Sequence, residues 1–98
     1  MKINQTLEDK ELTVIPEGRL DSSTSIEFSD YLKVNWLPEM HKLVLDFSAV
    51  DYISSMGLRV LVSVYKQLGD REMYVVNANP AVREIFRLSG LLSVFHMQ

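Results

Sequence analysis

Two adjacent serines in the middle of the chain are the residues best placed to do chemistry. Ser54 and Ser55 follow the apolar segment 43–47 and a short polar turn, and a helical pattern of apolar residues begins after them. The first turn of a helix has backbone N–H groups without intrahelical partners and a partial positive charge, so it stabilises an anion such as a phosphate. A serine hydroxyl at this point is therefore a candidate phosphorylation site that leaves the fold intact.

The same two serines also fit a purely structural role. A serine before a helix is an ordinary N-cap, because its hydroxyl accepts a hydrogen bond from a backbone N–H of the first turn. From the local sequence alone, capping and phosphorylation both remain open. They are compatible if Ser54 caps the helix and Ser55 is modified.

Other chemistries are poorly supported by the residues and their spacing. The chain has no cysteine, which excludes a disulfide, a thiolate metal site and a cysteine nucleophile. His41 and His96 lack the spacing of a metal site, so we interpret them as surface histidines. Asp21, Asp46 and Asp51 could form an acidic cluster like that of a receiver domain, but their positions favour roles in turns and helix caps. We therefore predict no metal, no cofactor and no catalytic residue.

Length and composition limit the setting of this site. The 98 residues, 47% of them hydrophobic, predict one domain spanning residues 1–98 with a single core. A net charge of −3 without a Lys/Arg cluster argues against nucleic-acid binding. The N-terminus lacks the apolar stretch of a signal peptide, and no apolar run approaches the roughly 20 residues that span a bilayer. We expect a cytoplasmic protein that does not insert into a membrane.

The elements that position the serines can be read from hydrophobic periodicity. Strands are predicted near 2–7 and 11–16, the second closing at Pro16, and Gly18 is expected to mark a bulge or a close backbone approach. A helix follows from Thr24 to about Val34. Its predicted capping box joins Thr24 to Glu27, and its predicted inward residues are Ile26, Phe28, Tyr31 and Leu32.

The second half of the chain alternates strands and helices. A central strand spans 43–47, and a helix runs from Ser54 or Ser55 to a C-terminal stop near Gly69. A buried strand follows at 73–76, then a helix from Asn79 to Gly90 and a short strand near 94–96. The order β-β-α-β-α-β-α-β predicts an α/β domain with a mixed central β-sheet and helices packed on it.

The phase of the helix after Ser55 suggests which of its residues are exposed. Its predicted core face consists of Leu58, Leu61, Val62, Tyr65 and Leu68. At about 100° per residue this phase places Val60 on the opposite side, near Met56, with Val64 at the margin. Two interpretations remain open: a stripe that docks a partner, or isolated exposed valines of the ordinary kind.

Three segments of the chain carry a resemblance to a known family. They are Gly18-Arg19-Leu20-Asp21, Tyr52-Ile53-Ser54-Ser55-Met56-Gly57-Leu58, and Asn79-Pro80-Ala81-Val82 with Ser89-Gly90-Leu91. In this order and spacing they resemble the turn before the first helix, the phosphorylation loop and the third helix of a STAS domain of the bacterial anti-sigma factor antagonist type. The resemblance spans nearly the whole chain. Many relatives continue into a final helix at about the position of Gln98.

The resemblance implies roles for individual residues. Ser55 matches the serine that an anti-sigma factor kinase phosphorylates, and Asp21 matches an acidic residue near it. Ser54 and Met56 depart from the commonest pattern, which has Asp at the first position and Ser, Thr or Ala at the second. Together with the helical phase, this predicts a partner-binding surface made of Asp21, Ser54, Ser55, Met56, Gly57, Val60 and Val64, with Ser54 as the second choice for the phosphorylated residue.

The resemblance also implies a function. The unphosphorylated chain would bind an anti-sigma factor with serine/threonine kinase activity and so release a sigma factor, without being an enzyme itself. Phosphorylation would end the complex and a protein phosphatase would restore it. The chain would be a monomer or a weak dimer. Two alternatives remain: a STAS subunit of a lipid ABC transporter complex, and a STAS sensor that binds a nucleotide.

Overall fold

Strands and helices follow one another in an order close to the predicted one. A computed structural model of the protein describes residues 1–36, 39–69 and 71–98. Its elements are β1 (Lys2–Glu8), β2 (Glu11–Leu20), α1 (Thr24–Asn35), β3 (Lys42–Asp46), β4 (Val50–Ile53), α2 (Ser55–Leu68), β5 (Glu72–Val76), α3 (Pro80–Leu88) and β6 (His96–Met97). Only β4 has no counterpart among the predicted elements.

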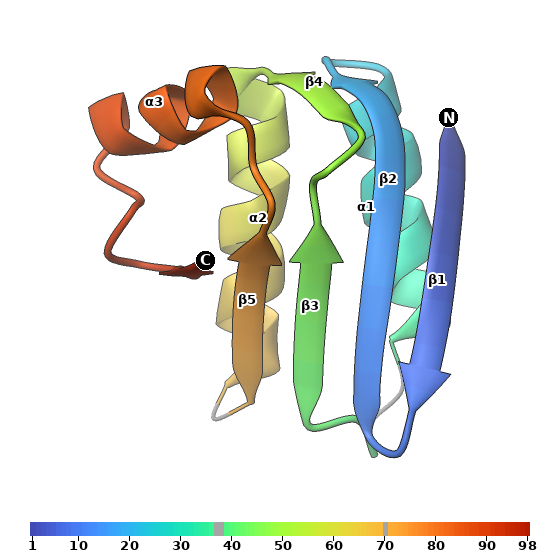
Figure 1. Ribbon diagram of the computed structural model, residues 1–98. Coiled ribbons are helices and arrows are strands. Elements are labelled where there is room, and N and C mark those ends of the chain that lie inside the picture. The colour runs from blue at the N-terminus through green and yellow to red at the C-terminus, as the bar shows by residue number, and fades with distance from the viewer. Residues whose placement is uncertain (37–38, 70) are drawn as a thin grey trace.

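A mixed sheet organises the fold (Figure 1). Its strands lie in the order β1-β2-β3-β5-β6, and β4 pairs with the far end of β2. β1 is antiparallel to β2, whereas the other pairs are parallel. Leu12 lies opposite Leu43, and Leu43 lies opposite Met73, so one row of apolar residues crosses three strands. The predicted α/β architecture is confirmed.

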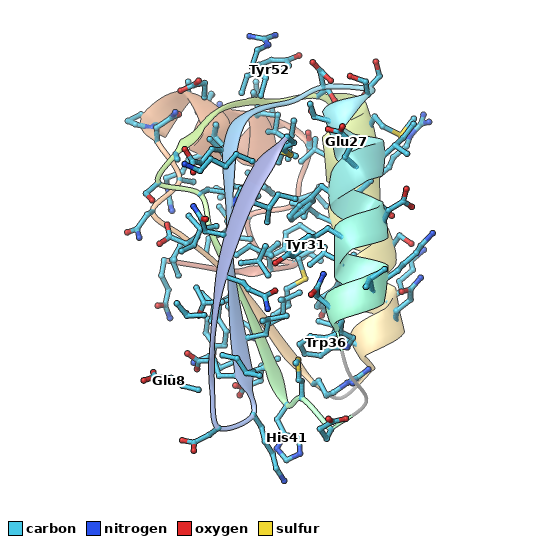
Figure 2. All side chains as sticks on the ribbon, turned by 90° about the vertical axis from the view of Figure 1, so that its right-hand side faces the viewer. Glu8, Glu27, Tyr31, Trp36, His41 and Tyr52 are labelled. Atoms are coloured by element: carbon cyan, nitrogen blue, oxygen red, sulfur yellow. The ribbon has the colours of Figure 1, made fainter. Side chains whose placement is uncertain are left out.

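The hydrophobic core lies between the sheet and two helices. α1 and α2 run side by side along the same face of the sheet (Figures 1 and 2). Their inward side chains meet alternate residues of the strands, as expected for a sheet covered on that face. The core between them includes Leu12, Val14, Phe28, Leu32, Leu43, Leu45, Leu61, Leu68, Met73 and Val75.

The third helix starts as predicted and anchors the C-terminal segment. The side-chain oxygen of Asn79 accepts a hydrogen bond from the Val82 N–H at 2.8 Å, which caps α3. The ring of Phe86 meets that of Phe95 edge-on with centroids 6.0 Å apart, and Phe95 meets Tyr65 of α2 at 5.6 Å. These contacts hold the segment after α3 against α2.

The second strand is longer than predicted. Pro16 does not end β2, because it lies between the ladder with β3, which ends at Val14, and the ladder with β4, which begins at Gly18. On its other side Pro16 lies opposite Ile3 of β1, so pairing with β1 continues through the proline. The register with β4 shifts between Gly18 and Arg19, and Gly18 has a φ of +98°. The predicted bulge at Gly18 is confirmed.

The short strand β4 takes the place of the predicted polar turn before α2. Only its first and last residues, Val50 and Ile53, are buried, whereas Asp51 and Tyr52 are exposed. This pattern lacks the alternation that marks a strand in a sequence. β4 exists because the end of β2 offers it a parallel partner.

The first helix has the predicted bounds within one residue but a different start. The predicted capping box is wrong: Ser23 is the N-cap, the Thr24 hydroxyl donates to the Arg19 carbonyl, and Glu27 accepts a hydrogen bond from the amino group of Met1 at 3.1 Å. Phe28 is buried as predicted, but Ile26 is 55% exposed because it lies on the other side of α1.

Candidate functional site

The turn between β4 and α2 places two serines at the start of the helix. α2 begins at Ser55, and Ser54 is its N-cap. The Ser54 hydroxyl oxygen accepts a hydrogen bond from the Gly57 N–H at 3.2 Å, and the Ser54 carbonyl accepts one from the Leu58 N–H at 3.0 Å. The Ser54 N–H donates to the Leu20 carbonyl at 2.8 Å, so the end of β2 holds the turn. Ser54 is thus the capping residue.

Ser55 is the first helical residue of α2, and it is exposed. Within the described residues its hydroxyl forms no hydrogen bond. The first turn of α2 contains no acidic residue, so no side chain there neutralises the positive end of the helix dipole. A phosphate on Ser55 would lie beside the N–H groups of this turn and still reach solvent.

Gly57 allows the start of α2 to pack closely against β2 and α1. A β-carbon at this position would lie 2.7 Å from Ile53 Cγ1 and 3.2 Å from both the Leu20 carbonyl oxygen and Ser25 Oγ. The first distance is too short for a carbon atom and the other two are tight, so a larger residue would force Ile53 and the neighbouring backbone of β2 to shift. Gly57 is buried, so it supports the site by packing and offers no surface to a partner.

Asp21 stands at the start of the neighbouring helix α1. Its Oδ1 atom accepts hydrogen bonds from the N–H groups of Ser23 and Thr24, both at 3.0 Å. The Thr24 N–H and then the Ser23 hydroxyl lower the pKa of Asp21 to about 2. In the part of the chain that the structure describes, no hydrogen bond joins Asp21 to Ser55. Asp21 therefore binds two N–H groups at the start of α1, whose N-cap residue is Ser23, and the neighbouring Leu20 carbonyl holds the serine turn.

A shallow hollow of about 480 Å³, which we call the Ser55 groove, lies next to Ser55. One side of α2 and the segment after α3 form its walls, which consist of Ser55, Leu58, Arg59, Val62, Ser63, Lys66, Ser89 and Leu91. The groove is apolar along its length, with the two exposed cations Arg59 and Lys66 in its wall. Neither cation forms an ion pair within the described residues. The groove is complementary to a surface that is both apolar and acidic.

The prediction that Val60 is exposed on α2 is wrong, whereas Val64, predicted at the margin, is half-buried. Val60 is only 9% exposed and belongs to the core, and Val64 is half-buried in a separate hollow that also contacts Leu32 and Trp36. The side of α2 that carries Val60 and Val64 faces α1, whose Leu32 lines the same hollow as Val64. Tyr65, which was predicted to face the core, is instead 39% exposed. The apolar pattern of one helix could not show that another helix lies alongside it.

The structure brings Ser54, Ser55 and half-buried Met56 together in one turn, while Val60 and Val64 lie elsewhere. Sequence reasoning missed the Ser55 groove apart from Ser55 itself. A signal was present: Ser55, Arg59, Val62 and Lys66 follow one another at steps of four, three and four residues, which is the spacing of one helix face.

Residues that were weighed as candidates for a metal or phosphotransfer site make ordinary structural contacts. Asp46 Oδ1 accepts hydrogen bonds from the Ser48 N–H at 3.0 Å and from Asn77 Nδ2 at 3.2 Å, and the ring of His96 stacks on Tyr74 at 4.8 Å. Across residues 1–36, 39–69 and 71–98, no group of acidic, histidine or cysteine side chains is arranged to hold a metal ion. No helix in these ranges is long and apolar enough to cross a membrane.

Comparison with known proteins identifies the family. The family model of the STAS domain matches residues 2–98, and the chain belongs to this family. BtrV of Bordetella bronchiseptica, a protein assigned as an anti-sigma factor antagonist, is 35% identical over 97 residues. This match covers 97% of the present chain and 84% of BtrV. The resemblance seen in the sequence is therefore confirmed.

Solved structures of anti-sigma factor antagonists have the same fold as this chain. An anti-sigma factor antagonist from Mycobacterium paratuberculosis superimposes with a TM-score of 0.84 at 29% identity, covering 98% of this chain and 85% of that one. The anti-sigma factor antagonist SpoIIAA superimposes in its unphosphorylated form with a TM-score of 0.85 at 16% identity, covering 99% and 86%. The phosphorylated form of SpoIIAA from Bacillus gives 0.76 at 15% identity, covering 99% and 89%. The SpoIIAA matches show a shared fold.

Proposed function

We propose that this protein is an anti-sigma factor antagonist whose binding to an anti-sigma factor kinase is switched by phosphorylation of Ser55. The observation that carries the proposal is the exposed Ser55 hydroxyl at the first position of α2, beside an apolar groove that contains Arg59 and Lys66. The similarity to BtrV supplies the class of partner. The whole chain, residues 1–98, acts as one STAS domain in the cytoplasm, where sigma factors work.

The docking surface of the unphosphorylated chain is the Ser55 groove. An apolar segment of the kinase covers Leu58 and Val62, and acidic groups of the kinase meet Arg59 and Lys66. The exposed Ser55 then lies within the contact, close enough to be delivered to the kinase active site. Val60 and Val64 take no part in this surface, since Val60 is buried and Val64 lines the separate hollow beside α1.

The phosphoryl transfer needs only an acceptor from this chain. The Ser55 oxygen attacks the γ-phosphorus of ATP held by the kinase, a new O–P bond forms and the bond to the bridging oxygen breaks, so ADP leaves. The hydroxyl proton passes to a base of the kinase. This chain is thus a substrate without catalytic residues. A separate phosphatase cleaves the phosphoserine with water and regenerates the hydroxyl.

The phosphate changes the groove in two ways. It adds about −1.5 to −2 charges at neutral pH, next to the acidic groups of the bound kinase. It also lies one helical turn from Arg59, so it competes with the kinase for that guanidinium. A kinase carboxylate that loses Arg59 is left as a buried charge without a partner, which costs about 3–5 kcal/mol and corresponds to a loss of affinity of roughly 10²- to 4 × 10³-fold. Phosphorylation therefore releases the kinase.

Ser54 is the poorer acceptor of the two serines. Its hydroxyl oxygen already accepts the Gly57 N–H, and the residue is half-buried. Modification of Ser54 would remove the cap of α2. Ser55 has neither constraint.

The test uses the kinase that co-purifies with the protein. The purified pair is incubated with ATP, the modified residue is mapped by mass spectrometry, and complex dissociation is followed in parallel. Ser55→Ala should keep binding yet resist release by ATP, and Ser55→Asp should bind more weakly. The matched control is Ser22→Ala, an exposed serine at the start of α1, which should behave as wild type.

The outcomes separate the alternatives. Phosphate on Ser54 would move the site by one residue. A complex that ATP does not affect, with both serines unmodified, would contradict the proposal and leave a transporter subunit as the better reading. Saturable nucleotide binding by the isolated chain would instead indicate a sensor.

A further inference from the structure

The N-terminal strand is a free edge of the sheet. β1 pairs with β2 along one side, and no described strand pairs with its other side (Figure 1). It is seven residues long, whereas β6 at the opposite edge has two. Every residue of β1 except Ile3 is exposed. An edge of this length presents a row of unpaired N–H and C=O groups that can bind another strand.

β1 lacks the features that normally prevent an edge strand from pairing with a strand of another molecule. It contains no proline or glycine, and its register with β2 is continuous from Lys2 opposite Glu17 to Glu8 opposite Glu11. Its charged residues, Lys2 and Glu8, stand only at its two ends. Edges that avoid pairing usually carry a charge, a proline or a bulge in the middle.

The sequence of β1 is complementary to itself in antiparallel orientation. When two copies are aligned antiparallel about Gln5, opposite charges meet at both ends, apolar residues meet inside them, and polar residues meet at the centre. The pairs are Lys2 with Glu8, Ile3 with Leu7, Asn4 with Thr6, and Gln5 with itself. In each pair both residue numbers are odd or both are even. Their side chains therefore lie on the same face of the sheet, and their backbone N–H and C=O groups point toward the same edge of the strand.

We propose that β1 joins two copies of this chain into a two-fold symmetric dimer in which the two sheets become one. Symmetry doubles each favourable pair, so two Lys2–Glu8 contacts and two Ile3–Leu7 contacts form at once. Leu7 is 52% exposed in the single chain, and Ile3 of the second copy covers it. The backbone hydrogen bonds of the new ladder supply the affinity, and the side-chain pairs fix the register.

The dimer leaves the candidate functional site uncovered. β1 forms one edge of the sheet, whereas the walls of the Ser55 groove come from α2 and from the segment after α3. The proposal rests on β1 alone and is independent of any role for Ser55.

The test exploits the opposite charges at the two ends of β1. Lys2→Glu places glutamate against glutamate at both ends of the dimer, and Glu8→Lys places lysine against lysine. Each variant alone should associate about tenfold more weakly than wild type, given the usual size of cross-strand charge effects. In an equimolar mixture the two variants pair with opposite charges at both ends, so a heterodimer should form with near wild-type affinity.

Sedimentation equilibrium measures the masses, and native mass spectrometry identifies the heterodimer. The wild-type mass should rise with concentration from 11.3 kDa toward twice that value. The control Lys66→Glu makes the same charge change on α2 and should dimerise as wild type. Circular dichroism confirms that each variant is folded.

Three results would overturn the proposal. One is a wild-type chain that stays monomeric up to about 1 mM, where even weak association is measurable. The second is a dimer that neither charge reversal weakens. The third is a mixture of the two variants that associates no better than each alone.

Discussion

α1 and α2 begin next to each other at the end of β2, yet they are capped by different chemistry. At α1 the ionised carboxylate of Asp21 accepts the N–H groups of Ser23 and Thr24. At α2 the neutral hydroxyl of Ser54 accepts the N–H of Gly57. A negative charge already occupies the start of α1, and none occupies the start of α2.

This difference supports the choice of Ser55 as the proposed phosphorylation site. The Ser23 hydroxyl donates to Asp21 at 3.0 Å, so a phosphate there would lose this bond and face a carboxylate. Ser55 is exposed and stands at a helix start without an acidic side chain. Two serine-rich helix starts in one chain thus differ in charge, because one binds a carboxylate and the other a neutral hydroxyl.

The largest expected effect comes from breaking the close approach of the two helix starts. Gly57→Ala would normally stabilise a helix by about 1 kcal/mol, but here the new methyl group would meet Ile53 and the Leu20 carbonyl. Overpacking of this kind costs about 1–3 kcal/mol, so the melting temperature should fall by about 5 °C or more. The control Ser63→Ala, exposed on the same helix, should melt at or above the wild-type temperature. Equal melting of the two variants would contradict the packing described.

The next effect separates the capping serine, Ser54, from the proposed acceptor, Ser55. Ser54→Ala removes the side-chain cap of α2 and should cost about 1 kcal/mol of unfolding free energy. Ser55→Ala removes an exposed hydroxyl and should change the same quantity by less than about 0.5 kcal/mol. Urea denaturation of the two variants measures both values. A larger loss for Ser55→Ala would show that the roles of the two serines are reversed.

A smaller effect compares the same substitution at both helix starts. Ser55→Glu places a carboxylate at an uncompensated helix start and should leave stability unchanged or raise it by about 0.3–1 kcal/mol at low salt. Ser23→Glu loses a hydrogen bond to Asp21 and sets two carboxylates side by side, so it should lower stability. Thermal melts at low and high salt check both signs, because added salt should shrink the effect. Effects of the same sign at both positions would refute the contrast between the two caps.

The smallest effect concerns acid. Because the pKa of Asp21 falls from 3.8 to about 2 on folding, its contribution to stability is fully present above pH 3.8 and is lost as the pH falls toward about 2. Asp21→Asn should therefore flatten the pH dependence of unfolding free energy between these values. Ser54→Ala should leave that dependence as in wild type, since a hydroxyl does not titrate there. Denaturant melts at a series of acidic pH values decide between these expectations.

Features that depend on a few neighbouring residues were predictable. The Ser54 cap, the stop of α2 at Gly69 with its φ of +63° and the Asn79 cap of α3 all follow from local hydrogen bonding and backbone freedom. The position of Ser55 at the start of α2 follows from the same reasoning, because it comes directly after the capping residue. The family resemblance then supplied the partner class, which no local rule contains.

Features that depend on distant segments were not predictable in this way. Val60 is buried because α1, about thirty residues earlier, lies against α2. β4 forms because β2 runs past Pro16 and offers a free edge. Glu27 binds the amino group of Met1, which is distant in the sequence, while the Thr24 N–H already donates to Asp21. In each case the local sequence allows two arrangements, and a contact with a distant segment selects the one that is observed.

The last residue of β2 links the two helix starts in a further sense. The Leu20 carbonyl accepts the Ser54 N–H, Leu20 is fully buried, and the neighbouring Arg19 carbonyl accepts the Thr24 hydroxyl. Local opening of this strand end would free both helix starts together, so their amides should exchange with solvent as one cooperative unit. A partner that binds only the closed form in the Ser55 groove would then slow exchange at the start of α1 as well, although α1 contributes no residue to that groove.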